Sequence, residues 1–120
     1  MTQRVAVYGT LKQGQSNHHI LADSPLVGRC QLKQITLYDI GPYPGAKLRS
    51  SGGIDIEVYD VTDEIFAALD ELEGYIPHAP KTGHYDRCRL ETPFGLVWVY
   101  VYNLDVSGLR EIRCGGWVAR

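Results

Sequence analysis

The sequence has no long hydrophobic run. None of its apolar stretches approaches the ~18 residues that a membrane-spanning helix needs, and its first residues lack the basic and apolar regions of a secretory signal peptide. We therefore expect a cytoplasmic protein that makes no contact with a membrane.

Basic residues are not clustered either. The 120 residues include 12 Lys and Arg against 14 Asp and Glu, a formal net charge of -2, and no run of Lys and Arg occurs. Proteins that bind polyanions do so through clustered basic side chains. We therefore expect no nucleic-acid partner.

Cysteine is scarce. The three cysteines are odd in number and form no Cys-x-x-Cys pair, which argues against a disulfide framework. The histidines lack metal-ligand spacing as well, because adjacent side chains on a helix point about 100° apart. We expect free thiols and no bound metal. The residues considered are Cys30, Cys88, Cys114, His18, His19, His78 and His84.

What the sequence does contain is the composition of one globular domain, 44% hydrophobic and 22% charged, which we expect to span residues 1–120. Hydrophobic patterns predict strands and helices in no regular βαβ alternation, which indicates an α+β fold with a strongly curled sheet or a small barrel. The predicted strands are 3–8, 26–40, 54–59, 84–92 and 96–104, and the predicted helices are 16–22 and 63–73.

The long strand predicted over 26–40 contains a change of phase near Lys33-Gln34, which we interpret as a bulge. It ends in Gly41-Pro42-Tyr43-Pro44-Gly45. Because proline fixes φ and restricts the residue before it, this segment is predicted to be a stiff loop. The Tyr43–Pro44 bond is a candidate for the cis form. In the next strand, 54–59, every second residue is polar, which predicts one face exposed to water.

The first strand ends at a glycine. In Val5-Ala6-Val7-Tyr8-Gly9-Thr10-Leu11-Lys12-Gln13-Gly14, Gly9 allows close approach of a ligand to the backbone or a positive φ. Backbone N–H groups after such a glycine are candidates for binding a phosphate or carboxylate. An ordinary turn is the alternative interpretation.

The helix over 63–73 has Thr62 as its predicted N-cap and ends at Gly74. Its apolar residues fall in one arc, and helical geometry places Glu73 within that arc. The other acids of the helix fall outside it, where carboxylates are solvated. The apolar residues are Ile65, Phe66, Leu69 and Leu72, and the other acids are Asp63, Glu64, Asp70 and Glu71.

A carboxylate directed toward the core is a candidate catalytic group. Burial raises a glutamate pKa above its usual value of about 4.3 because it disfavours the charged form. Such a group can exchange protons near neutral pH. The alternative is that Glu73, in the last turn of the helix, swings out into water.

Several motifs occur in order along nearly the whole chain. Together they resemble the γ-glutamylcyclotransferase superfamily, and the short bacterial YtfP-type branch most closely. The last of these motifs matches only in part, because Gly116 of Gly115-Gly116-Trp117 stands where Gly-Asp-Trp has aspartate. The matching motifs are Tyr8-Gly9-Thr10-Leu11, Gly41-Pro42-Tyr43-Pro44-Gly45, Leu69-Asp70-Glu71-Leu72-Glu73-Gly74-Tyr75, Tyr85 with Arg87, and Gly115-Gly116-Trp117.

The resemblance implies a small mixed β-barrel flanked by short helices. It also implies a cavity in which the loop Tyr8-Gly9-Thr10-Leu11 binds the amino-acid end of a small γ-glutamyl substrate and Glu73 acts as acid and base. The α-amine of such a substrate can attack its own γ-carbonyl and close 5-oxoproline, a reaction that needs no cofactor. Tyr43 and Tyr85 are expected to line the cavity.

Two rival interpretations come from other classes of protein. One is a binding protein of the same fold that holds a small metabolite without turnover. The other is a nucleotide-binding protein, because residues 9–16 have the glycine spacing of a P-loop, although Gln15 stands where that motif requires lysine. Whether the protein is a monomer or a homodimer is left open by the sequence.

Overall fold

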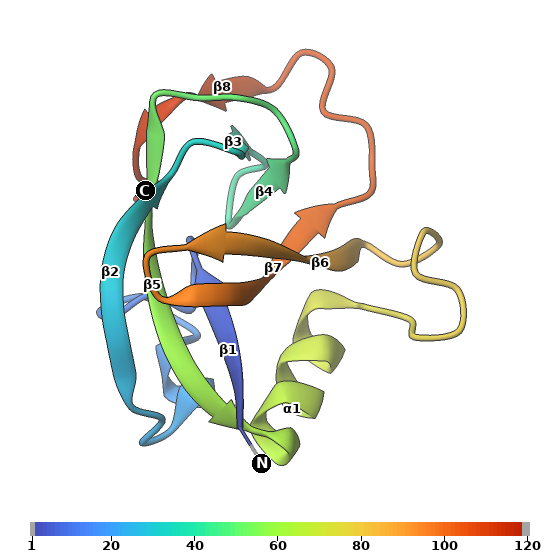
Figure 1. Ribbon diagram of the computed structural model, residues 1–120. Helices are drawn as coiled ribbons and strands as arrows, with labels where there is room; N and C mark the ends of the chain where they lie inside the picture. The colour runs from blue at the N-terminus through green and yellow to red at the C-terminus, as the bar shows by residue number, and fades with distance from the viewer. Residues whose placement is uncertain (1, 119–120) are drawn as a thin grey trace.

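The computed structural model describes residues 2–118 and has an α+β fold in which strands predominate (Figure 1). The elements in chain order are β1 (Thr2–Val7), the 3₁₀-helix η1 (His18–Leu21), β2 (Leu26–Leu32), β3 (Thr36–Asp39), β4 (Pro44–Lys47), β5 (Gly53–Thr62), α1 (Asp63–Glu73), β6 (Tyr85–Thr92), β7 (Gly95–Tyr102), β8 (Arg110–Ile112) and β9 (Cys114–Gly115).

The strands form two sheets. The larger has the order β2-β5-β1-β7-β6, with β9 pairing to β5, and the smaller has the order β4-β3-β8. The larger sheet is mixed, because β1 runs antiparallel to β5 and parallel to β7. The α+β class is therefore confirmed, while the strands of residues 2–118 do not close into the predicted barrel.

The prediction of one strand over 26–40 is wrong. β2 pairs with β5 in the larger sheet, and β3 pairs with β4 and β8 in the smaller one. The change of phase near Lys33-Gln34 marks the passage of the chain from one sheet to the other. Leu32 and Ile35, on either side of that passage, are both buried.

The predicted stiff loop over 41–45 is shorter than expected. Pro44 and Gly45 already belong to β4, where they lie opposite Asp39 and Tyr38 of β3. A proline is tolerated as the first residue of a strand because it has no N–H to leave unpaired. Every peptide bond in the described part of the chain is trans, so the expectation of a cis Tyr43–Pro44 bond is wrong.

The helix predicted over 63–73 is confirmed as α1. The Thr62 hydroxyl accepts a hydrogen bond from the Ile65 N–H at 3.2 Å, and Gly74 ends the helix in the left-handed conformation, with φ of 67°. Phe66 and Leu69 face the core. By contrast, the helix predicted over 16–22 is only the single-turn η1, and the side chain of its N-cap residue, Asn17, does not cap the helix.

The pairing of β1 with β5 determines where α1 ends. Thr2 lies opposite Thr62 and Val7 opposite Glu57, so α1 begins near the start of β1. At about 1.5 Å per residue the helix rises about 16 Å, close to the roughly 20 Å spanned by β1. Figure 1 shows α1 climbing back alongside β1. The last turn of α1 therefore reaches the loop that follows β1.

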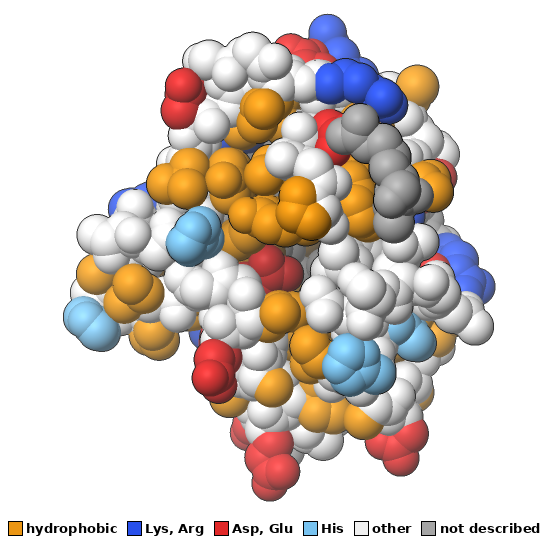
Figure 2. Space-filling view, turned by 180° about the vertical axis from the view of Figure 1, so that it is seen from behind, with side chains coloured by type: hydrophobic (Ala, Val, Ile, Leu, Met, Phe, Trp, Pro, Cys, Tyr) orange, Lys and Arg blue, Asp and Glu red, His pale blue; other side chains and the backbone are white. Residues whose placement is uncertain are grey.

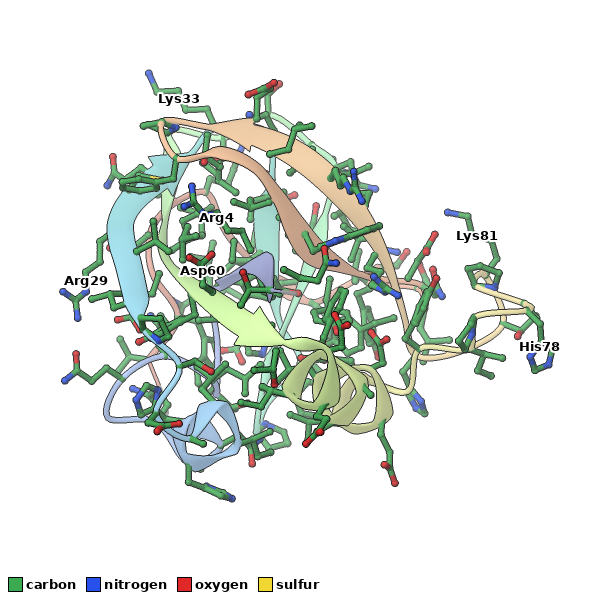
Figure 3. The ribbon with its side chains drawn as sticks, turned by 60° about the horizontal axis from the view of Figure 1, so that its bottom comes forward. Arg4, Arg29, Lys33, Asp60, His78 and Lys81 are labelled. Atoms are coloured by element: carbon green, nitrogen blue, oxygen red, sulfur yellow. The ribbon has the colours of Figure 1, made fainter. Side chains whose placement is uncertain are left out.

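The loop between α1 and β6 extends away from the sheets. Figure 3 shows His78 and Lys81 on this loop, well outside the body of the protein. Lys81 forms an ion pair with Asp86 at the start of β6. None of residues 75–83 lines the cavity described below, which is bordered instead by Gly74 and His84 at the two ends of this loop.

The packing of α1 on the sheets can be tested at Leu69, which is 0% exposed. We expect Leu69→Ala to lower the free energy of unfolding by about 2–5 kcal/mol, because a cavity replaces the buried side chain. The same change at Leu96, which is 52% exposed, is expected to cost less than about 0.5 kcal/mol. Urea denaturation measures both, and equal losses would contradict this packing.

Candidate active site

Gly9 is required by a close contact within the protein. A Cβ atom at this position would lie 2.7 Å from both Cγ and Cδ of Pro44, and Gly9 is not among the glycines with positive φ. The close approach expected at Gly9 therefore occurs, but the group that approaches is Pro44 of β4. This contact joins the loop after β1 to the smaller sheet.

The first part of the loop after β1 has backbone donors at Gly9, Thr10 and Leu11 that no acceptor of the described chain pairs with. The Lys12 N–H donates to Gly9 O at 3.0 Å, and the Asn17 N–H donates to Thr10 O at 2.8 Å. The Asn17 side chain also donates to the Thr10 hydroxyl at 2.9 Å. No protein acceptor within residues 2–118 pairs with the N–H groups of Gly9, Thr10 or Leu11. These N–H groups are available to an anionic ligand.

The same loop is anchored by Glu57 of β5. The Glu57 carboxylate accepts hydrogen bonds from the Gln13 N–H at 2.8 Å, the Tyr59 hydroxyl at 2.9 Å and Arg29 at 3.3 Å. Burial alone would raise the pKa of Glu57, but these hydrogen bonds outweigh it and lower the pKa. The prediction that this face of the strand is exposed to water is wrong at Glu57 and Tyr59, which are both buried.

A cavity with a volume of about 570 Å³ lies between the loop after β1, the start of β4 and the end of α1. The face shown in Figure 2 carries gathered hydrophobic side chains with acidic atoms recessed among them. All of the residues predicted for the site line this cavity, namely Tyr8, Gly9, Thr10, Leu11, Tyr43, Glu73 and Tyr85.

Glu73 is the half-buried acid of this cavity. Its carboxyl group has no hydrogen-bond partner within the described chain, and no Lys or Arg lines the cavity. Desolvation therefore acts without compensation and raises the pKa of Glu73 to about 7. The side chain does not swing out into water, which was the alternative left open by its position in the sequence.

Two tyrosines line the cavity, and the hydroxyl group of each is hydrogen-bonded to the protein backbone. The Tyr8 hydroxyl donates to Tyr100 O at 2.7 Å and accepts from the Ala46 N–H at 3.3 Å. The Tyr85 hydroxyl donates to Pro44 O at 2.7 Å. Burial raises the pKa of both tyrosines above their ordinary value. Both therefore stay neutral, so Glu73 is better suited than either tyrosine to accept a proton.

The sequence interpretation missed Tyr100 and misplaced Asp70. Tyr100 of β7 lines the cavity, and its hydroxyl donates to the Asp70 carboxylate at 2.6 Å. Asp70 was expected to be solvated, but it is half-buried and also paired with Arg87. Strand alternation alone placed Tyr100 on one face of β7 without indicating that this face meets α1.

The histidines lie in different environments and do not form a cluster. His18 contacts Leu11 O through Nδ1 at 2.9 Å, His19 contacts Ser16 O at 3.1 Å, and His84 lies at the cavity. Within residues 2–118, no three His, Cys, Asp or Glu side chains are grouped closely enough to hold a metal ion. Of the helices described, none combines the length and apolar character needed to cross a bilayer.

The fold and the cavity define a class of small α+β proteins that place one desolvated acid opposite a loop of free backbone N–H groups. A family model described as gamma-glutamyl cyclotransferase, AIG2-like, matches residues 5–119. The chain belongs to this γ-glutamylcyclotransferase family, and its relatives include proteins of the YtfP type.

Individual relatives cover nearly the whole chain. It is 36% identical over 117 residues to the gamma-glutamylcyclotransferase family protein YtfP of Escherichia coli K12, which covers 98% of this chain and 97% of the relative. The solution NMR structure of E. coli ytfP superposes with a TM-score of 0.75 at 36% identity, over 97% and 96% of the two chains. Gamma-L-glutamyl-butirosin B gamma-glutamyl cyclotransferase of Niallia circulans is 36% identical over 92% of this chain and 72% of its own.

The raised pKa of Glu73 predicts a pH-dependent stability. The folded protein keeps a proton on Glu73 up to about pH 7, whereas the unfolded chain releases it near 4.5. The contribution of this side chain to stability therefore falls as the pH rises from about 4.5 to about 7. We expect Glu73→Gln, which cannot ionise, to match wild type at pH 5 and to exceed its free energy of unfolding at pH 8 by up to about 3 kcal/mol.

Urea denaturation at the two pH values measures this difference. Glu64→Gln, a change to an exposed acid at the other end of α1, provides the matched control and is expected to shift stability equally at both pH values. A Glu73→Gln protein that gains nothing over wild type between pH 5 and pH 8 would show that the wild-type carboxyl is solvated.

Proposed function

We propose that this protein cyclises the γ-glutamyl group of a small γ-glutamyl amine or peptide to 5-oxoproline and releases the amine, with Glu73 as general acid and base. The observation that carries the proposal is that Glu73, with a pKa of about 7 and no Lys or Arg of residues 2–118 in its cavity, lines the same cavity as residues 9–11, whose N–H groups are free. The relative from N. circulans is named as a γ-glutamyl cyclotransferase, which supports the same class of reaction here.

The reaction needs little beyond a curled substrate and a proton carrier. The Glu73 carboxylate takes a proton from the substrate α-ammonium, and the freed amine attacks the γ-carbonyl carbon to form the lactam C–N bond. Glu73 then returns that proton to the leaving nitrogen, and the bond from the γ-carbon to this nitrogen breaks as the carbonyl re-forms. The Glu73 carboxylate takes the second proton from the ring nitrogen, which becomes the lactam N–H, and passes it to the released amine, which departs as an ammonium. Holding the two ends of the γ-glutamyl unit together provides most of the required proximity. Atoms and charge balance without a cofactor.

The cavity offers a separate group for each charge on the substrate. The N–H groups of Gly9, Thr10 and Leu11 bind the substrate α-carboxylate or the oxyanion that develops on the γ-carbonyl oxygen. Tyr43, with the rings of Tyr8 and Tyr85, forms the walls. Because no Lys or Arg among residues 2–118 lines the cavity, backbone donors carry the recognition of negative charge. We place this reaction in the cytoplasm.

The proposal predicts that Glu73→Gln lowers the rate of 5-oxoproline release by roughly 10²–10⁴-fold, the usual contribution of a general acid or base. Purified wild-type and variant proteins are incubated with a panel of γ-glutamyl amines and dipeptides, and 5-oxoproline is quantified. Glu64→Gln is the matched control and is expected to retain the wild-type rate.

Two results would contradict the enzymatic proposal. Equal rates for wild type and Glu73→Gln would remove Glu73 from the reaction. Saturable binding of γ-glutamyl compounds by calorimetry, with no product from any of them, would instead identify a binding protein of the same fold.

A further inference from the structure

Arg87 of β6 is enclosed by aromatic rings in the interface between α1 and the larger sheet. Its guanidinium carbon lies 4.2 Å from the centre of the Phe66 ring, 4.4 Å from that of Trp98 and 4.5 Å from that of Tyr75. Only 16% of the side chain is exposed. A planar guanidinium suits this surrounding because it stacks on rings and is weakly hydrated.

The same guanidinium is paired with a carboxylate of α1. Arg87 Nε lies 3.1 Å from Asp70 Oδ1, and that oxygen also accepts the hydrogen bond from the Tyr100 hydroxyl at 2.6 Å. Asp70 is thereby connected to two strands, β6 through Arg87 and β7 through Tyr100. Breaking a buried pair of this kind leaves an unpaired charge.

The residues held by Arg87 lie on either side of Glu73 in the chain. Asp70 is three residues before Glu73, and Tyr75 is two residues after it. The backbone connects these two positions directly, because the Tyr75 N–H donates to Asp70 O at 2.9 Å. The last turn of α1 is therefore attached to the sheet at both of its ends, and Glu73 lies between the two attachments.

We propose that Arg87 is a positioning residue for Glu73: through Asp70 and Tyr75 it fixes the last turn of α1 in the orientation that directs the Glu73 carboxyl into the cavity. The inference rests on the proposed function for its catalytic meaning. Arg87 itself does not line the cavity, so it acts on the reaction only through the position of Glu73.

The pKa of Glu73 indicates whether its carboxyl group lies in the cavity, because burial is what raises this pKa. The ionisable groups that line the cavity with it are Tyr8 from the end of β1, Tyr43, His84, Tyr85 of β6, Tyr100 of β7 and Glu71 of α1. None of the acids and tyrosines among them favours the ionised form of Glu73. A fall in the Glu73 pKa after a distant substitution therefore signals exposure to water.

The test is an NMR titration of protein labelled with [δ-¹³C]glutamate, with the Glu73 signal assigned through its loss in Glu73→Gln. Arg87→Met removes the guanidinium but keeps an unbranched apolar chain. We expect it to lower the Glu73 midpoint from about 7 toward the ordinary value of about 4.3. If Arg87 acted only through its charge, the unpaired Asp70 carboxylate would keep the midpoint in place or raise it.

Arg89→Met is the matched control. Arg89 lies on the same strand, and its guanidinium stacks on the same Trp98 ring at 4.5 Å, but it is exposed and makes no ion pair with α1. The Glu73 midpoint is expected to stay at the wild-type value. Arg87→Lys keeps the cation beside Asp70 without the planar stack and is expected to lower the midpoint less than Arg87→Met. If Arg87→Met does not fold, the Glu73 midpoint in Arg87→Lys alone decides the test.

Turnover provides the second measurement. For Arg87→Met we expect kcat to fall roughly ten- to hundredfold, as displaced catalytic groups do, with KM within about twofold of wild type because the loop of residues 9–11 is unchanged. An unchanged or raised Glu73 midpoint in the folded Arg87 variants overturns the inference. Absence of 5-oxoproline from wild type overturns the proposed function instead, and the titration still decides the role of Arg87.

Discussion

The chemistry of the cavity depends on one desolvated carboxyl group. Glu73 lies in the cavity, and nothing in the described part of the chain gives it a cation or hydrogen-bond donor that would compensate the lost hydration. Its protonated form is therefore favoured up to about pH 7. A solvated glutamate would be too weak a base near neutral pH, and a glutamate paired with arginine would be weaker still. Arg87, which is half-buried and packs on α1, does not line the cavity and is paired with Asp70.

The fold produces this arrangement through simple chain geometry. β1 and β5 are antiparallel neighbours, α1 follows β5 directly, and the helix is nearly as long as β1. Its last turn therefore returns to the residues that follow β1, although about sixty residues separate Gly9 from Glu73 in sequence. Pro44 closes the third side by packing on Gly9. The cavity thus forms where the two sheets and the helix meet. The larger sheet leads into the loop with the free N–H groups, the smaller sheet contributes Pro44, and the helix contributes Glu73.

The bounds of α1 and the inward direction of Glu73 could be predicted from the sequence, because residues close to them in the chain determine both. Thr62 and Gly74 mark the ends of α1, and the 3.6-residue period directs Glu73 inward. Predictions failed where one segment covers another that is distant in sequence. Glu57 has the polar alternation of an exposed strand face and becomes buried only because the loop after β1 folds over it. The position of Asp70 in the helix predicts a solvated acid, but Arg87 and Tyr100 of the hairpin β6–β7, distant in sequence, contact it in the folded protein.

The most direct measurement is a crystal structure of the Glu73→Gln variant soaked with an intact γ-glutamyl amine. The account predicts the substrate α-carboxylate or γ-carbonyl oxygen on the N–H groups of Gly9, Thr10 and Leu11. It also predicts the α-amine within about 2.6–3.2 Å of the side chain at position 73, with the chain curled so that this amine faces the γ-carbonyl carbon. A substrate bound in an extended form, or with its amine away from position 73, would contradict the account.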